Sequence, residues 1–362
     1  IGYFSYESFQ YVEPTLKYQN SKIPLISLCE STELVVFDNF KGTFYIIVNT
    51  QDKTSKGYDL AKARINEIKT TLFSLQASIP HNIEKKNIDI SSKSNIDYKT
   101  YEEQVNTIKQ FVHEGEIMQA VLSKEVTFDG SYDPMTLYRA LRLINPSPYM
   151  FYLSFDDFNV IGASPEILVQ QTNGKVTIRP IAGTRKRGET SNEDLTNKID
   201  LLEDDKEKSE HMMLVDLARN DLSKVAEIGT VQVDEMMVIE KYSHVMHMTS
   251  NVIGQKKSDA SAVDCLKAAL PAGTLSGAPK IRAMEILSKL ENRVRGIYGG
   301  AVGYIGFNGS LDTAIVIRTA IHTNKDVKVG VGGGIVFDSI PENEWQETES
   351  KLAVFREALK YS

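Results

Sequence analysis

The feature that most constrains the fold is a succession of strand-like segments without a helix between them. Four such segments lie at residues 149–155, 159–163, 167–170 and 176–180, after an apolar stretch at 120–127. A doubly wound parallel sheet needs a helix between consecutive strands, and this order does not provide one. The sequence therefore predicts an α+β fold with antiparallel sheets.

The remaining pattern divides the chain into three parts. Strands are expected within residues 1–50, and a polar segment containing Pro80 precedes the mixed region. We therefore expect a partial N-terminal region at 1–80, a linker at 81–97 and a main region at 98–362. Because the first residue is Ile1 and lies in a strand-like segment, we expect a fragment. Helices are expected at 57–76, 101–115, 192–222, 280–290 and 343–358, and further strands at 298–307, 313–322 and 327–331.

Charge and cysteine usage exclude several classes of protein. The formal charge is −7, which argues against a general nucleic-acid-binding protein. No apolar run approaches the roughly 18 residues of a membrane-spanning helix. Cys29 and Cys265 are far apart and have no metal-like spacing, so we expect neither a disulfide framework nor a cysteine metal site. These features predict a cytoplasmic protein.

Two Glu-x-x-Glu pairs are the first candidates for chemistry. Glu207 and Glu210 lie in the expected helix 192–222, and Glu344 and Glu347 open the last helix. Residues three apart share one helix face, so each pair presents two carboxylates together. Two such faces brought together would supply the hard oxygen ligands that Mg²⁺ prefers. An isolated pair of this kind is also typical of a solvated helix face, and the spacing alone leaves both interpretations open.

Glycine-rich stretches and isolated polar residues are the second group. The stretch 271–280 combines glycines and hydroxyls ahead of a helix, which suits anion binding through backbone N–H groups. The stretch 331–335 predicts a second tight turn. Arg318 interrupts an apolar strand and needs a negatively charged partner, either structural or from a substrate. His247 lies among apolar residues, which is also typical of a hydrogen-bonded core histidine.

Taken together, these stretches resemble the chorismate-binding enzymes, and among them most closely the large subunits of anthranilate synthases. The resemblance runs through nearly all of 98–358, and residues 1–50 also resemble the N-terminal region of the family. It is carried by the motifs at 145–150, 162–166, 179–184, 210–221, 271–280, 298–304 and 338–341. It implies two facing antiparallel sheets flanked by helices, with chorismate bound between them.

The resemblance also implies roles for individual residues. Glu210 and Glu347 match direct Mg²⁺ ligands, and Glu207 and Glu344 match neighbours that hold metal-bound water. Glu166 matches the acid that helps the ring hydroxyl leave. The other matches are the substrate-binding positions Gly183, Thr184, Tyr298, Arg318, Gly332, Gly333 and Gly334, and the polar active-site positions His247 and Thr274.

Two further positions predict which nucleophile is used. Relatives that add water to form isochorismate or salicylate have a lysine in place of Gln119. Relatives that form aminodeoxychorismate usually have a lysine in place of Ala182. Because neither lysine is present, the resemblance implies an Mg²⁺-dependent carbon–oxygen lyase that forms anthranilate, the first step of tryptophan biosynthesis. An aminodeoxychorismate synthase remains the main alternative, followed by an isochorismate or salicylate synthase. A non-catalytic tryptophan sensor is an alternative of a different class.

The resemblance finally implies partners. Neither cysteine has the surroundings of a glutaminase nucleophile, so ammonia is expected from a separate glutamine amidotransferase subunit. Pro148, Tyr149 and Met150 match the tryptophan feedback site, which makes tryptophan an expected inhibitor of the full-length protein. Residues 28–31 resemble the other half of that site but occur in a different order along the chain. We therefore expect this chain to bind tryptophan weakly.

Overall fold

The computed structural model describes residues 1–74, 83–242 and 245–362 and forms two compact units. The smaller unit comprises Ile1 and residues 28–84. It contains a hairpin of β3 (Glu33–Asp38) and β4 (Thr43–Val48) and the helix α1 (Ser55–Ser74). The larger unit comprises residues 2–27 and 85–362 and contains both large sheets. No helix among the described residues has the length and apolarity that crossing a membrane requires.

The first large sheet has the order β11-β13-β10-β9-β16-β15-β1-β2, with β12 added beside β13. The pairs whose registers are described are all antiparallel, as predicted. Its strands are β1 (Gly2–Phe4), β2 (Ile26–Leu28), β9 (Ile167–Thr172), β10 (Lys175–Ile178), β11 (Ile181–Lys186), β12 (Gln232–Lys241), β13 (Val245–Gln255), β15 (Ala301–Ile305) and β16 (Leu311–Ile315).

The second large sheet has the order β14-β6-β18-β17-β8-β7, with β5 beside β6, and is also antiparallel. Its strands are β5 (Lys93–Ser94), β6 (Gln119–Asp129), β7 (Tyr149–Ser154), β8 (Asn159–Ser164), β14 (Gly277–Ala278), β17 (Thr319–His322) and β18 (Asp326–Ile335). The predicted α+β class with antiparallel sheets is therefore confirmed.

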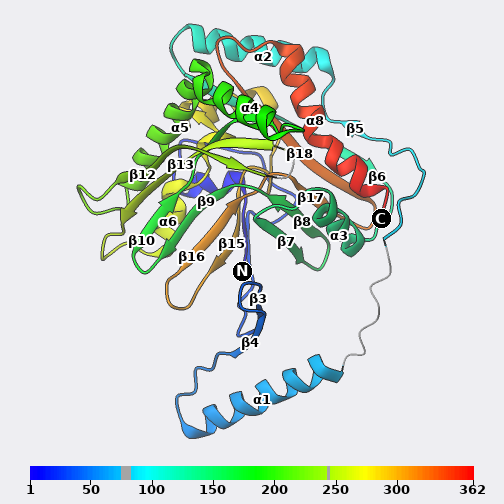
Figure 1. Cartoon of the computed structure of the whole chain (residues 1–362), viewed down its shortest axis with the longest axis vertical. Helices are drawn as coiled ribbons and strands as arrows, with labels where there is room; N and C mark the ends of the chain where they lie inside the picture. Colours follow the sequence, from blue (N-terminus) through cyan, green and yellow to red (C-terminus); the bar gives the residue numbers. More distant parts are fainter. Residues whose placement is uncertain (75–82, 243–244) are drawn as a thin grey trace. The chain divides into compact units, whose positions relative to one another are not determined.

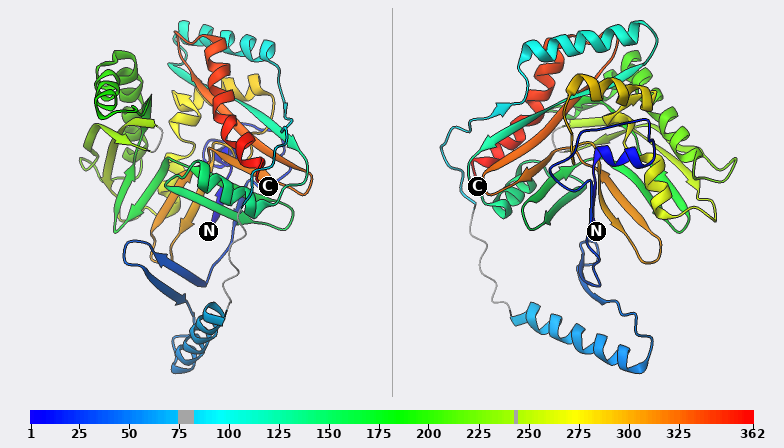
Figure 2. Two further views of the ribbon diagram at one scale, coloured as in Figure 1. Left: turned by 45° about the vertical axis from the view of Figure 1, so that its right-hand side comes forward. Right: turned by 180° about the vertical axis from the view of Figure 1, so that it is seen from behind.

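Helices cover both sheets (Figure 1). Helix α5 packs on β11 and β13, and α8 packs on β18, as the two further views in Figure 2 also show. Apolar side chains of α5 and α6 form one core with the first sheet, and those of α2 and α7 form another with β6. The helices are α2 (Tyr98–His113), α3 (Pro134–Ile144), α4 (Ser191–Glu203), α5 (Asp205–Ser223), α6 (Ala262–Ala269), α7 (Lys280–Glu291) and α8 (Pro341–Leu359), with 3-10 turns η1 (Tyr6–Tyr11) and η2 (Gly273–Leu275).

The unit boundaries differ from the three-part division expected from sequence. Residues 2–27 belong to the larger unit because β1 pairs with β15 and the buried Glu7 carboxylate accepts the backbone N–H groups of Arg295 and Gly296. Residues 85–97 also belong to it, since β5 pairs with β6. Residues 75–82, which include the start of the expected linker, lie outside the described residues.

Three local predictions were wrong. The expected helix 192–222 is two helices, because Asp204 has an extended backbone and its carboxylate caps α5 by accepting from the N–H groups of Lys206 and Glu207. The expected strand 313–322 is also two elements, interrupted at Arg318. The expected turn at 331–335 is instead the end of β18, whose three successive glycines pair with β6.

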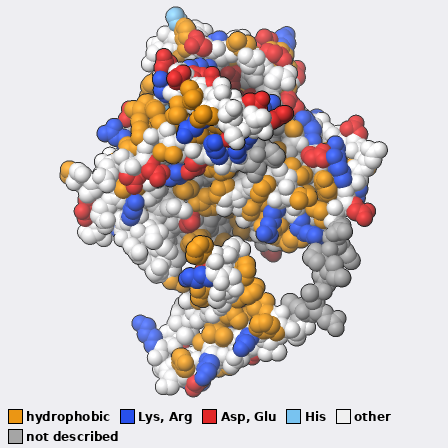
Figure 3. Space-filling view, in the orientation of Figure 1, with side chains coloured by type: hydrophobic (Ala, Val, Ile, Leu, Met, Phe, Trp, Pro, Cys, Tyr) orange, Lys and Arg blue, Asp and Glu red, His pale blue; other side chains and the backbone are white. Residues whose placement is uncertain are grey.

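One face of the molecule shows how its charged side chains are distributed (Figure 3). On the face drawn in Figure 3, basic and acidic side chains are interspersed, and the coloured residues there form no extended basic area. This face therefore lacks the clustered positive charge on which nucleic-acid binding depends.

Candidate active site

A cavity of about 190 Å³ lies where the chain crosses between the two sheets of the larger unit. The chain leaves β8 in the second sheet, passes Glu166 and enters β9 in the first sheet. It leaves β16 in the first sheet, passes Arg318 and enters β17 in the second. Both residues line the cavity. The structure thus brings together the sequence-predicted residues Glu166, Thr274, Tyr298, Arg318, Gly332, Gly333 and Gly334.

Glu166 has the properties of a proton donor. Its side chain is buried, and its Oε1 accepts a hydrogen bond of 3.2 Å from Thr274 Oγ1. Burial raises the pKa of Glu166 to about 8, although the Thr274 hydrogen bond and the charges of Arg318 and Lys351 act in the opposite direction. The carboxyl group is therefore mostly protonated at neutral pH, as a general acid requires.

Arg318 brings a positive charge into the same cavity. Its backbone is left-handed, with φ of 49°, which is a strained conformation for a residue with a side chain. Burial lowers the pKa of Arg318, and none of the described residues forms a hydrogen bond or ion pair with its guanidinium. A buried guanidinium of this kind can accept a carboxylate through two parallel hydrogen bonds.

The glycines of β18 form one wall of the cavity, which we call the glycine wall, and at Gly332 and Gly334 it has no room for a side chain. A Cβ on Gly332 would lie 2.6 Å from the Leu122 carbonyl oxygen and 3.0 Å from the Tyr298 hydroxyl. A Cβ on Gly334 would collide with the Gln119 amide, so the Gln119 side chain packs against this strand, although it is not among the residues that line the cavity. Glycine is needed at these two positions because other parts of the chain approach the backbone closely.

Lys351 is a cavity residue that sequence analysis missed. Its Nζ donates a 2.7 Å hydrogen bond to the Gly332 carbonyl and lies 2.7 Å from Glu347 Oε1. The available signal was its position on α8, four residues after Glu347, where an ion pair within the helix is expected.

The two pairs of glutamates come from α5 and α8. The pKa of Glu210 is raised by burial, with contributions from the charges of Glu207, Glu344 and Glu347. Burial likewise raises the pKa of Glu344. A Cβ on Gly333 would lie 3.4 Å from Glu344 Oε2, so the glycine wall lies next to the glutamate pair of α8. The charges of Glu207, Glu344 and Glu347 therefore act on Glu210, and that of Glu347 also acts on Glu344.

The acidic side chains fit a magnesium ion in chemistry, but they are currently paired with basic residues. Within the described ranges, no three Asp, Glu, His or Cys side chains are grouped closely enough to hold one ion. Glu207 contacts Arg185 at 3.2 Å, Glu210 contacts Lys206 at 3.9 Å, and Glu347 contacts Lys351. Mutual repulsion and hard oxygen donors are what a divalent cation would offset. Binding therefore requires these basic groups to release the carboxylates.

Three predicted residues lie on neighbouring strands, outside the residues that line the cavity. His247 on β13 has its Nδ1 3.0 Å from Thr184 Oγ1 and 3.2 Å from the Gly183 carbonyl on β11. Because a carbonyl only accepts hydrogen bonds, the second contact favours a hydrogen on Nδ1. Burial lowers the pKa of His247, so its ring is neutral near pH 7. Gly183 has φ of 66° and brings its backbone against Glu207.

The residues expected for tryptophan feedback lie elsewhere. Pro148 and Tyr149 line a separate open cavity of about 360 Å³, and the Tyr149 hydroxyl donates to Asp312 at 2.8 Å. Met150 is the next residue of β7 and is not among the residues that line this cavity.

Comparison with known proteins gives a consistent result. Residues 1–357 match the sequence profile of the chorismate binding enzymes. Anthranilate synthase component 1 of Pseudomonas aeruginosa is 46% identical over 98% of this chain and 74% of that protein. The corresponding protein of Aquifex aeolicus is 44% identical over 99% of this chain and 74% of its own length.

Solved structures agree with this result. The crystal structure of anthranilate synthase component I from Streptococcus pneumoniae superposes with a TM-score of 0.88 and 36% identity, covering 98% of this chain and 80% of the other. A structure described as a 2,3-dihydroxybenzoate-specific isochorismate synthase from Bacillus anthracis superposes less well, with a TM-score of 0.67 and 25% identity over 77% and 76% of the two chains. The sequence match, the shared architecture and the composition of the cavity together show that this chain belongs to the chorismate-binding enzyme family.

Proposed function

We propose that this chain converts chorismate and ammonia to anthranilate, pyruvate and water. The relatives that match nearly its whole length are named anthranilate synthase component 1. The observation that carries the proposal is the cavity itself, where a protonated Glu166 faces the same space as the Arg318 guanidinium, which has no hydrogen-bond or ion-pair partner within residues 1–74, 83–242 and 245–362. These are the groups needed to bind a dianion and to protonate a leaving hydroxyl.

Substrate binding follows from the distribution of charge. Chorismate carries two carboxylates, and Arg318 can hold one of them with paired hydrogen bonds. Lys351 places a second positive charge beside Gly332, and the glycine wall lets the ring approach the backbone. Leu275, Ile317 and Phe355 supply apolar contacts and exclude water.

Glu166 serves in both halves of the proposed reaction. The ammonia nitrogen forms a bond to the ring while the ring C–O bond to the hydroxyl breaks, and Glu166 donates the proton that makes this group leave as water. The resulting carboxylate lies near Arg318 and Lys351, which stabilise its charge. It can then accept the ring proton as the ether C–O bond breaks and enolpyruvate leaves. The proton released by the new ammonium group balances the one that converts enolpyruvate to pyruvate.

The acidic pairs are proposed as the metal site. Glu210 and Glu347 would hold Mg²⁺ directly, and Glu207 and Glu344 would hold its water ligands. When bound, the cation would neutralise the second carboxylate of chorismate and polarise the ring as a Lewis acid.

Two side chains support ammonia as the nucleophile. Gln119 packs against Gly334 at the cavity wall and cannot take a proton from water. Ala182 on β11, opposite Met248, offers no amine that could attack the ring. Ammonia needs neither group, because its neutral form is already nucleophilic. These positions favour anthranilate over isochorismate and aminodeoxychorismate.

The proposal extends to partners. We propose that a separate glutamine amidotransferase subunit supplies the ammonia, because Cys29 is exposed on the smaller unit and Cys265 is buried in α6 with a pKa raised by burial. The name component 1 of the relatives supports a second component. We further propose that tryptophan inhibits the full-length protein.

Product identification tests the proposal directly. The chain is incubated with chorismate, Mg²⁺ and ammonium, and the products are followed by fluorescence and mass spectrometry. Anthranilate and pyruvate in equal amounts are expected. Isochorismate, salicylate or 4-amino-4-deoxychorismate as the main product would refute it. Glutamine in place of ammonium should give no product unless the amidotransferase is added.

A further inference from the structure

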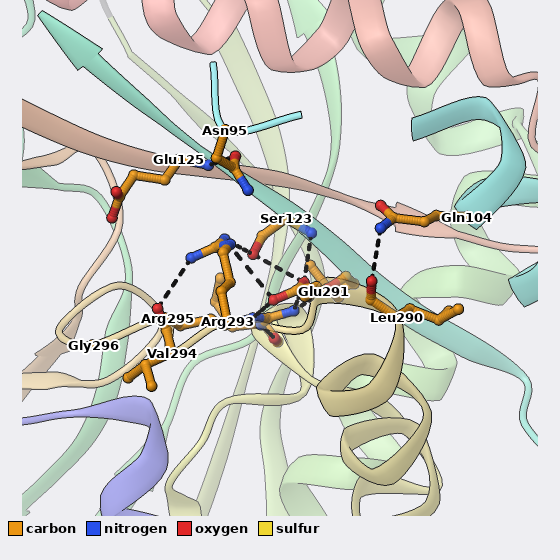
Figure 4. A network of polar contacts seen from close by, with 12 residues as sticks. Asn95, Gln104, Ser123, Glu125, Leu290, Glu291, Arg293, Val294, Arg295 and Gly296 are labelled. Carbon is orange, nitrogen blue, oxygen red and sulfur yellow. Dashed lines mark hydrogen bonds and ion pairs between the residues drawn. The ribbon is translucent and has the colours of Figure 1, made fainter. Parts of the chain in front are cut away.

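A buried ion pair of Glu291 and Arg295 lies at the centre of a network of polar contacts (Figure 4). Arg295 follows α7, and its guanidinium contacts the Glu291 carboxylate with Nε at 2.8 Å and Nη2 at 2.6 Å. Both side chains are almost fully buried. Ser123 on β6 donates to the same carboxylate through its N–H and its hydroxyl. The pair therefore lies between α7 and the strand that supports the glycine wall.

The remaining donors of Arg295 reach two walls of the cavity. Nη1 donates to the Leu275 carbonyl at 2.7 Å, and Nη2 donates to the Val121 carbonyl at 2.6 Å. Leu275 and Val121 both line the cavity, and they come from η2 and β6. The Tyr6 ring covers the guanidinium, 4.4 Å from its centre, which shields these contacts from water. One planar group thus fixes the relative positions of η2 and β6.

This geometry links Arg295 to Glu166. Thr274, which donates to Glu166, precedes Leu275 in the three-residue turn η2. A displacement of Leu275 therefore displaces the Thr274 hydroxyl. We propose that Arg295, held by Glu291, is a positioning residue that keeps Thr274 hydrogen-bonded to the acid Glu166. The inference rests on the proposed role of Glu166 in the proposed reaction.

The charges of the pair favour this role. Burial lowers the pKa of Arg295, but the Glu291 carboxylate together with Tyr6 and Tyr298 offsets burial, so the pKa is raised overall. Burial raises the pKa of Glu291, but Arg295 and Arg293 together with the Ser123 N–H offset burial, so the pKa is lowered overall. Both groups stay ionised, and charge-assisted hydrogen bonds hold η2 more rigidly than neutral ones would.

The decisive variant is Arg295→Lys. A lysine keeps the charge, but its single ammonium cannot reproduce the planar fork that spans Glu291, Leu275 and Val121. We expect kcat to fall at least about tenfold. Loss of the Thr274 hydrogen bond removes an influence that lowers the pKa of Glu166. In the plot of kcat against pH, the alkaline limb should therefore move to higher pH, by about half a pH unit or more.

The other ionisable groups that line the cavities containing Glu166 make no hydrogen bond to Arg295 among the described residues, and Tyr298 is coupled to Arg295 only through its charge, which lysine keeps. Arg318 lies between β16 and β17, and Lys351 lies on α8. Asp221 on α5 and Arg179 after β10 line a second, much smaller cavity of about 30 Å³ that also includes Glu166. None of these side chains has a hydrogen bond to Arg295 among the described residues, so a shifted limb reports the Thr274 contact.

A double-mutant cycle with Thr274→Val tests whether Arg295 acts on Glu166 through Thr274. Thr274→Val removes the hydroxyl and should move the limb in the same direction. If Arg295 acts through Thr274, adding Arg295→Lys should shift the limb little further. Arg282→Lys is the matched control, because Arg282 lies on α7 but pairs with the exposed Glu116 and Glu285. It should leave both kcat and the limb unchanged.

Each outcome decides the inference. Should Arg295→Lys not fold, as judged by circular dichroism, Glu291→Gln takes its place in the same cycle. A folded variant with the wild-type limb, or fully additive shifts with Thr274→Val, would overturn the proposal. Rates are followed as chorismate consumption, whatever the product. A wild type that consumes chorismate without forming anthranilate contradicts the proposed function, whereas an unchanged limb contradicts only the role of Arg295.

Discussion

Glu166 and Arg318 lie at two neighbouring crossings between the sheets, and each is anchored to the other crossing through its backbone carbonyl. The Glu166 carbonyl accepts the N–H of Ile315 at 3.0 Å, and the Arg318 carbonyl accepts the N–H of Ala163 at 3.0 Å. The acid and the cation are therefore fixed relative to each other by strand pairing. This arrangement gives the proposed chemistry a rigid frame, from which the following predictions are drawn.

Activity should be lost at alkaline pH because Glu166 is the acid. Its pKa of about 8 means that the donor form is present below pH 8 and disappears as pH rises through that value. In kcat/KM for chorismate, we expect an alkaline limb near pH 8. Glu166→Gln should lower kcat by about 10²–10⁴-fold and remove the limb. A retained limb in that variant would assign it to another group.

Removing a charge from either acidic pair should abolish turnover without unfolding the protein. Glu210→Gln and Glu347→Gln each delete a charged oxygen donor from the proposed magnesium site. Glu357→Gln is the control, because Glu357 lies on α8 but pairs with Lys85 and Lys360 at the other end of the helix. Rates are measured across a magnesium titration. Near-normal rates in the first two variants would exclude the metal assignment.

Lys206 should compete with the metal. Its Nζ lies 3.9 Å from Glu210 Oε1, and its side chain is largely exposed. Lys206→Met should therefore lower the magnesium concentration needed for half-maximal activity, by roughly two- to fivefold, because exposed pairs contribute little energy. Calorimetric titration of magnesium into the chain without substrate should show the same direction. Weaker binding in the variant would contradict the proposed competition.

Two substitutions of Arg318 should weaken chorismate binding equally but differ in their effect on the stability of the protein. Arg318→Ala and Arg318→Gly both remove the guanidinium and should raise KM for chorismate by about 100-fold or more, which is the loss expected for a paired charge–carboxylate contact. Glycine tolerates the φ of 49° at this position, so Arg318→Gly should be the more stable of the two by about 1 kcal/mol. Thermal unfolding measures this difference. Equal stabilities would mean that the backbone relaxes in the alanine variant.

Adding a single methyl group to the glycine wall should lower kcat/KM by different amounts at Gly332 and Gly333. In Gly332→Ala the new Cβ meets the Leu122 backbone oxygen, so we expect kcat/KM to fall more than about tenfold. In Gly333→Ala the nearest atom is a Glu344 carboxylate oxygen at 3.4 Å, an ordinary contact, and the loss should be smaller. Comparable losses in both variants would show that the wall acts as one unit instead.

The sequence by itself determined the antiparallel α+β class and most of the candidate site. Consecutive apolar strands without intervening helices allow little else, and the glutamate spacing fixes which carboxylates share a helix face. It did not reveal that 313–322 changes sheets, because nothing in an apolar run marks a left-handed residue such as Arg318. It also missed Lys351 and Arg295, whose roles come from contacts with Gly332 and Leu275.

Only the tertiary structure decided how these parts act together. The pKa of Glu166 depends on burial between two sheets, and burial is a property of packing rather than of spacing along the chain. Likewise, the glycines at 332–334 read as a turn locally, but pairing with β6 makes them a strand, since backbone hydrogen bonds with a distant segment outweigh the weak local preference of glycine. Residues far apart in sequence meet in the cavity because the sheets bring them there.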